Sequence, residues 1–137
     1  MLRTLTDGLD GILTIEQGDS LDLTLQVITV SVSGTGARTE SVVNPSNLLS
    51  LTVTLFAEAD ETIINSRTNQ SILGVNGGTL EATLVRLRLQ PNDNIIVDAD
   101  LERGDVEYHV ARFVFTWSDG VLTRTGVEEV RFAVRKL

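Results

Sequence analysis

His109 is the only histidine of the chain, and it is the first residue to consider for catalysis or metal binding. A single imidazole cannot build a His-rich metal site or a catalytic triad unless another subunit supplies the remaining groups. His109 also falls on the same side of a predicted strand as Phe113 and Phe115, because alternate residues of a strand share one face. We therefore expect a histidine packed in the core or at its edge, and not a catalytic one.

Asp98, Asp100 and Glu102 recur at every second position, a spacing that can converge on a calcium ion where the backbone curls. An EF-hand loop starting at Asp98 would need glycine at its sixth position and glutamate at its twelfth, where this chain has Arg103 and His109. In an extended segment the same carboxylates line one solvated face. The sequence favours a solvated acidic loop, with a calcium site as the alternative.

Three further motifs have simpler structural interpretations. Arg103-Gly104-Asp105 spells a tripeptide that integrins recognise, but a turn glycine flanked by charges is expected here. Asn69-Gln70-Ser71 matches a glycosylation acceptor, which would be modified only after secretion. Glu58, Asp60 and Glu61 would need a concave pocket that separates their pKa values before they could act as acid and base. These patterns predict neither an enzyme nor a cofactor.

Length and composition restrict the remaining classes of protein. The chain has 137 residues, which corresponds to one domain, and its formal net charge of −8 disfavours binding to the phosphates of nucleic acids. The absence of cysteine excludes disulfides, thiolate metal sites and a thiol nucleophile. No apolar run approaches the roughly 18 residues of a membrane span, and the first residues lack the apolar core of a signal peptide. We expect a soluble acidic domain that binds neither nucleic acid nor membrane.

The elements that must position these residues are strands. Apolar residues alternate with polar ones over several segments, and β-branched residues are frequent. The apolar phase changes at Val27–Ile28, which predicts a bulge or bend, and changes again within residues 79–90. Residues 33–47 and 69–78 are expected to be loops. The predicted strands cover residues 12–15, 21–32, 49–55, 62–67, 79–90, 106–117 and 121–135.

These strands predict an all-β fold. No helical pattern lies between them, so a βαβ arrangement is disfavoured and a single antiparallel β-sandwich is favoured. About seven strands would make this sandwich immunoglobulin-like. We expect it to cover residues 12–137, preceded by a short N-terminal arm of residues 1–11.

The order of these elements resembles small immunoglobulin-like domains of tailed-bacteriophage virions, such as capsid-decoration domains and the N-terminal domain of upper-baseplate proteins. The likeness lies in four segments, residues 13–25, 49–55, 87–93 and 108–134. It implies a non-enzymatic structural protein of the virion, most simply a decoration or cement protein bound in many copies to the shell. A tail or baseplate adaptor is the alternative. The partners would be the major capsid protein, or tail and baseplate proteins, and further copies of this chain in the particle.

A carbohydrate-binding or adhesion module is the alternative from another class. Sugar binding usually needs exposed aromatic rings, and the chain has six aromatic residues. Four of them fall on predicted core faces, namely Phe113, Phe115, Trp117 and Phe132.

Contacts with the virion partner are expected from the arm and from the loops at residues 33–47 and 58–78. The candidate contact residues are Leu2, Leu5, Leu9, Arg38, Val42, Val43, Ile63, Ile64, Arg67, Ile72 and Leu73.

Overall fold

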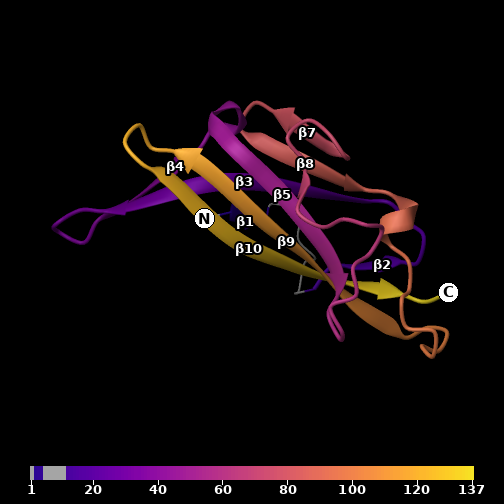
Figure 1. Cartoon of the computed structure of the whole chain (residues 1–137). Helices are drawn as coiled ribbons and strands as arrows, with labels where there is room; N and C mark the ends of the chain where they lie inside the picture. Colours follow the sequence, from indigo (N-terminus) through magenta and orange to yellow (C-terminus); the bar gives the residue numbers. More distant parts are fainter. Residues whose placement is uncertain (1, 5–11) are drawn as a thin grey trace.

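Two five-stranded sheets face each other in the computed structural model of the chain (Figure 1). The structure describes residues 2–4 and 12–137. Its strands come from the alternating segments of the sequence, because a period of two buries one side of each strand and leaves the other side wet. The all-β sandwich predicted from the sequence is confirmed.

The first sheet has the order β1-β3-β8-β7, and β4 also pairs with β3. Its longest strand, β3, spans Leu21–Val32. The N-terminal half of β3 pairs with β8, and its C-terminal half forms a hairpin with β4. The remaining bounds are Leu2–Thr4 for β1, Arg38–Val42 for β4, Gly78–Glu81 for β7 and Leu84–Leu89 for β8.

The second sheet has the order β2-β10-β9-β5-β6. Its centre is the long antiparallel pair β9 (Val106–Ser118) and β10 (Thr123–Arg135), joined by the turn that Ser118-Asp119-Gly120 predicts. The other strands are β2 (Thr14–Glu16), β5 (Leu48–Ala57) and β6 (Gln70–Ser71). Two short 3₁₀ helices, η1 (Pro45–Asn47) and η2 (Pro91–Asp93), connect strands of the two sheets.

The core lies between the sheets and consists of the residues that the alternation selects. Each sheet contributes every second residue of its central strands, and the largest buried side chains are three phenylalanines of β9 and β10. The fully buried residues of the central strands include Leu23 and Leu25 of β3, Leu87 and Leu89 of β8, Leu51, Val53 and Leu55 of β5, Phe113 and Phe115 of β9, and Phe132 and Val134 of β10.

Part of the predicted loop at residues 33–47 is a strand. Arg38–Val42 forms β4, and Pro45–Asn47 forms η1. All five residues of β4 are exposed, so this strand has no buried side and no apolar alternation that could have revealed it. The change of apolar phase at Val27–Ile28 is not a bulge, because the pairings on either side keep their register. A register shift occurs instead in the β5–β9 pair, between Leu48 and Ser50.

The predicted strands at residues 62–67 and 79–90 are both wrong in detail. Residues 62–67 form a loop with one isolated bridge at Ile63, because Asn65 and Ser66 have positive φ angles. Residues 79–90 divide into β7 and β8, which pair as a hairpin through the two-residue turn Ala82-Thr83. The second change of apolar phase is therefore a chain reversal.

The first two strands of the chain, β1 and β2, also differ from expectation. β2 pairs with β10 in parallel, so the sandwich is not wholly antiparallel. Leu2–Thr4, expected to belong to an arm, forms β1 and pairs with β3 of the first sheet. The rest of the expected arm lies outside the described residues.

Candidate functional site

The two ends of the sandwich carry different chemistry. At one end, the β3–β4 hairpin and the β9–β10 turn both project beyond the body of the domain (Figure 1). Val30, Val32 and Val42 are exposed on the first hairpin, and Val121 and Leu122 are exposed at the second. Val121, at 87% exposure, has the most accessible of these side chains. Aliphatic side chains gathered at one end of a domain are typical of a surface that contacts another protein.

A groove of about 740 Å³ separates these two hairpins. Ile28 and Val30 line one wall, and Trp117 lines the other. The Trp117 ring stacks on Phe115 with a centroid distance of 5.6 Å, so the wall is an outward extension of the core. The charged residues at the groove are Arg38, Asp119 and Arg124. Arg38 makes an ion pair with Glu40 of its own hairpin, and Arg124 makes one with Asp119. An apolar floor with charges at its rim resembles the anatomy of a protein–protein interface.

Asp119 gives the tip of the β9–β10 turn a fixed shape. Its Oδ1 accepts hydrogen bonds from the backbone N–H groups of Val121 and Leu122, at 2.9 and 2.7 Å. These two bonds, together with the Arg124 Nε that donates to Oδ2, lower the pKa of the Asp119 carboxyl to about 2. The turn therefore holds its two aliphatic side chains outward on an ordered backbone.

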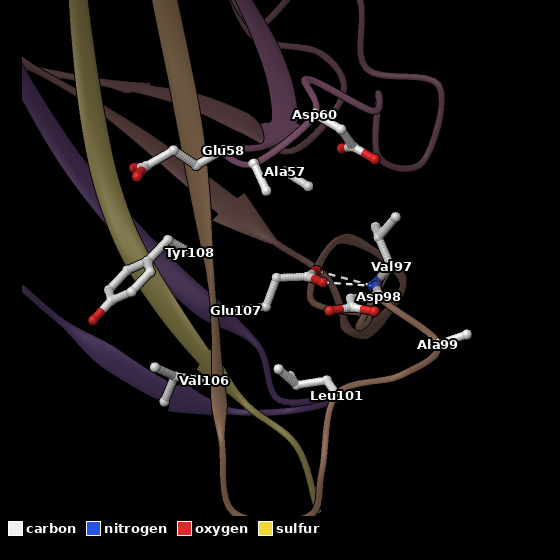
Figure 2. Close-up of a pocket in the computed structure, with 11 residues that line it drawn as sticks. Ala57, Glu58, Asp60, Val97, Asp98, Ala99, Leu101, Val106, Glu107 and Tyr108 are labelled. Carbon is white, nitrogen blue, oxygen red and sulfur yellow. Dashed lines mark hydrogen bonds between the residues drawn. The ribbon is translucent and has the colours of Figure 1, made fainter.

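The opposite end of the sandwich is acidic and contains a pocket of about 530 Å³ (Figure 2). Small apolar side chains cover much of its wall. Glu58, Asp60, Asp98 and Glu107 supply the carboxylates. Further exposed carboxylates of the neighbouring loops are those of Glu61, Asp100, Glu102 and Asp105. Much of the net negative charge of the chain is therefore gathered at this end.

Glu107, which lines this pocket, forms a hydrogen-bonded pair with His109. The Glu107 carboxylate accepts hydrogen bonds from the backbone N–H groups of Val97 and Asp98, which Figure 2 shows as dashed lines. It also contacts Nε2 of His109 at 2.7 Å. Burial lowers the pKa of His109 more than Glu107 raises it, so the ring is neutral near pH 7 and donates from Nε2. His109 is fully buried, which confirms the packed histidine predicted from the sequence.

The carboxylates of the acidic end are held by local hydrogen bonds. Asp98 accepts from the backbone N–H of Asp100, Asp60 accepts from that of Thr62, and Glu58 pairs with Arg131. Within residues 2–4 and 12–137, no group of three or more His, Asp or Glu side chains is arranged to hold a metal ion. The calcium alternative therefore has no assembled ligand set in the described chain.

One of the two short motifs lies in a turn, and the other runs from Asn69 into β6. Gly104 has a φ of +89° and donates its N–H to the Lys136 carbonyl at 2.9 Å, as a turn glycine does. Asn69 has a φ of +45°, and its side-chain carbonyl oxygen accepts a hydrogen bond from the Thr54 hydroxyl. Both segments are exposed, and neither lies at the groove.

The predicted contact residues occupy three kinds of position. Arg38 and Val42 are exposed on the β3–β4 hairpin, at the apolar end, and Ile63 is exposed on the loop after β5. Val43 and Leu73 are half-buried against the core. For Leu2 only the strand pairing is described, and Leu5 and Leu9 lie outside the described residues.

Ile64, Arg67 and Ile72 correct the prediction, because all three are buried and present no surface to a partner. The two isoleucines fill the core beneath the 62–78 loop. Arg67, with 5% exposure, makes a bidentate ion pair with the fully buried Asp93 of η2, at 2.6 and 3.1 Å. A position in a polar loop gave no signal that this arginine points inward.

Sequence reasoning missed the aliphatic residues that define the apolar end. Val30, Val32 and Val121 were assigned to strands without regard to exposure, and Leu122 to the strand after the turn. The available signal was the position of these residues next to predicted turns, where strands leave the body of the sandwich.

Comparisons with known proteins give no relative. No family model, no curated protein and no solved structure matches the chain. Among the described residues, none of the helices has the length and apolar character needed to cross a membrane.

Proposed function

We propose that the protein is a non-enzymatic structural subunit that attaches to a larger particle by its apolar end and turns its acidic end outward. The particle that best fits the resemblance in the sequence is the shell of a tailed bacteriophage, with this domain as a decoration protein bound to the major capsid protein. The observation that carries the proposal is the cluster of exposed aliphatic residues on the two projecting hairpins at one end of the sandwich, with a pocket lined by four carboxylates at the other end.

The apolar end has the properties that docking requires. Val121 and Leu122 sit on an ordered turn, so little conformational entropy is lost when they are covered. The groove beside them is lined by the buried Ile28 and by Trp117, whose ring stacks on Phe115 of the core. A modest contact of this kind is sufficient for a subunit bound in many copies, because symmetry and multivalency add to the individual affinity.

The acidic end supports an outward orientation. Exposed carboxylates at residues 58–61 and 98–105 outnumber the cations of the same loops. Like charges on neighbouring copies repel, which keeps a densely decorated surface soluble and prevents particles from adhering to one another.

The arrangement of the aromatic rings favours this function over carbohydrate binding. The phenylalanines of β9 and β10 are buried, and Trp117 is stacked on one of them. Tyr108 is the most exposed ring within the described residues, and the guanidinium of Arg131 lies 3.8 Å from its centroid. The ring that could stack on a sugar is therefore already engaged by a cation.

A binding experiment with phage particles tests the proposal. The variant Val121→Asp/Leu122→Asp places two charges on the apolar tip, and we expect it to lose co-sedimentation with capsids to which the unaltered protein binds. Ile95→Asp is the matched control, because Ile95 is 43% exposed and precedes the acidic pocket at the other end. Equal binding by all three proteins, or glycan binding without particle binding, would refute the proposal. If the labelled protein appears on the tail and not on the shell in electron micrographs, the alternative of a baseplate or tail adaptor would be favoured.

A further inference from the structure

The outer edge of β10 is open along most of its length. β10 pairs with β9 on one side, and on the other side β2 covers only residues 133–135. Within the described chain, residues 123–131 have no hydrogen-bonded strand on that side. An unpaired edge of this length presents a row of backbone N–H and C=O groups that pair readily with another strand.

The hydrogen bonds between β10 and β2 show which residues of β10 face this edge. The Ala133 N–H donates to the Leu13 carbonyl at 2.8 Å, so the backbone groups of this odd-numbered residue point away from β9. The direction repeats at every second residue of a strand. The backbone groups of Thr125 and Val127 therefore point toward the open part of the edge.

The side chains along this edge suit a partner strand. Thr125 and Val127 are exposed, and β-branched residues form favourable cross-strand contacts. Arg124 donates to Asp119 through Nε at 2.9 Å, which leaves its two terminal nitrogens without a partner among the described residues. The Glu128 carboxylate has no ion pair within residues 2–4 and 12–137. One face of β10 thus offers a cation and an anion four residues apart.

We propose that β10 pairs antiparallel with β10 of a second copy of this chain, about a two-fold axis that passes through Gly126. In this register Thr125 lies opposite Val127 of the partner subunit, as a hydrogen-bonded pair. Arg124 lies opposite Glu128 of the partner subunit, on the other face of the strand. The axis repeats both contacts, so one strand supplies both halves of a self-complementary interface, as an isologous dimer requires.

The neighbouring registers lack this charge match. An axis at Glu128 or Glu129 places two glutamates opposite each other, which is destabilising. An axis at Thr125 or Val127 places Arg124 opposite an uncharged residue and forms no opposite-charge pair within β10.

An axis at Val130 also pairs opposite charges, Glu129 with Arg131 of the partner subunit, but the edge is too short for it. That register brings the partner strand against Ala133, whose N–H is already bound to β2. In the proposed register, residues 123–129 pair with the same residues of the partner subunit. The paired stretch then ends before β2 begins, and the open edge accommodates it.

The pairing joins the second sheets of two copies into one continuous sheet, to which each copy contributes five strands. It covers Val127, whose side chain is 57% exposed in the single chain. It also removes the open edge of β10 from solvent, and natural β proteins cover or interrupt such edges to avoid uncontrolled association.

Cysteine trapping tests the register directly, because the chain has no cysteine of its own. We expect an equimolar mixture of Thr125→Cys and Val127→Cys to form a covalent dimer on oxidation, since the two positions face each other with Cα atoms about 5.5 Å apart. Each variant alone is the matched control, because its two cysteines would be diagonal neighbours about 7–8 Å apart, too far for a disulfide. A covalent dimer of either variant alone would overturn the register, and no covalent dimer in the mixture would overturn the proposal.

Charge reversal tests the contact between Arg124 and Glu128 in the protein without cysteine. We expect Arg124→Glu and Glu128→Arg each to weaken self-association by about tenfold, because each makes two symmetric pairs repulsive, and the combined variant to restore it. Glu129→Arg is the matched control, because Glu129 lies on the opposite face of β10 and pairs with Arg112 of its own chain. We expect this control to associate nearly as well as the unaltered protein.

Sedimentation equilibrium up to about 1 mM protein suits the weak contact that a short strand pair makes. Thermal melts check that each variant is folded. A monomer at every concentration, an affinity that neither reversal changes, or equal weakening by Glu129→Arg would overturn the proposal.

This inference does not rest on the proposed function, because it concerns the protein free in solution. The two β9–β10 turns of the dimer point in opposite directions, so a copy docked by its turn would leave the turn of its partner facing away from the particle. Failure of the cysteine and charge tests would leave the particle-binding result unaffected.

Discussion

The buried pair of Arg67 and Asp93 is the interaction whose removal should cost the fold most. The side chain of Asp93 is fully buried and accepts four hydrogen bonds, two from Arg67 and one each from the Asn65 side chain and the Gln90 backbone N–H. Arg67 also donates to Gln70 and to the carbonyl of residue 76. The pair joins the 62–78 loop to η2, two segments 26 residues apart along the chain.

We expect Asp93→Asn to lower the free energy of unfolding by about 3 kcal/mol. Removing one partner of a buried ion pair leaves the other charge uncompensated, which costs about 3–5 kcal/mol. The lower end applies because Arg67 keeps its two other acceptors. For a domain of this size that loss corresponds to a fall in Tm of roughly 10 °C. Urea unfolding followed by circular dichroism measures it.

The exposed pair of Arg88 and Asp22 supplies the matched control. It has the same bidentate geometry, with distances of 2.8 and 3.0 Å, but both side chains are about half exposed. We expect Asp22→Asn to have a much smaller effect, because solvent screens the charges before and after the change. If Asp93→Asn destabilises the protein no more than Asp22→Asn does, the argument from burial is wrong.

The pH dependence of the same variant gives a second measurement. Burial raises the pKa of Asp93, but the hydrogen bonds from Arg67, Asn65 and Gln90 outweigh it, and the net pKa lies below the usual 3.8. A carboxyl group with a depressed native pKa stabilises the fold above its unfolded-state pKa and loses that contribution as the pH falls through the native value. Stability of the unaltered protein should therefore decline below about pH 4, and Asp93→Asn should lack that part of the decline.

Three further predictions concern other features. Burial depresses the pKa of His109 below 6.5, so the contribution of the neutral ring to stability is present above pH 6.5 and is lost as the pH falls toward the native pKa. The urea midpoints of the unaltered protein at pH 7.5 and pH 5.5 should therefore differ more than those of His109→Phe. Equal differences in the two proteins would contradict the prediction. A Cβ at Gly126 would lie 2.2 Å from the Phe115 ring, so Gly126→Ala should destabilise the fold by about 1–3 kcal/mol in thermal melts, whereas an unchanged Tm would show that the ring moves aside. The Asp119 carboxyl should titrate at about 2 by NMR, because turn amides and Arg124 stabilise its charge; a midpoint near 3.8 would show that the turn is open.

Local pattern was sufficient for the core of this fold. The alternation of Leu21, Leu23 and Leu25 and that of Phe113 and Phe115 predicted the buried faces, and all five side chains are in the core. Alternation works because burial on one side of a strand repeats every two residues, whichever strand lies next to it. The β9–β10 hairpin was also predictable, since Asp119-Gly120 indicates a turn and Gly120 takes a φ of +94° there.

Elements without a local pattern were missed. The β7–β8 turn contains Ala82 and Thr83, neither of which is a turn former, and only the pairing of the flanking strands reverses the chain there. β4 has no buried side, so its strand conformation depends wholly on its ladder with β3.

For the candidate site, the sequence named Arg38 and Val42 as candidate contact residues, and both are exposed. It did not distinguish them from Arg67 and Ile72, which are buried.

The sequence by itself determined an all-β sandwich without thiol chemistry, with an acidic surface and a core chosen by periodicity two. The tertiary structure decided which polar residues are buried and which aliphatic residues are exposed. Arg67 points inward because Asp93, distant along the chain, supplies a fixed counter-charge there. Val30, Val32 and Val121 stay in solvent because their hairpins extend beyond the opposing sheet. How far each hairpin extends depends on how the two sheets pack against each other, which no single strand encodes.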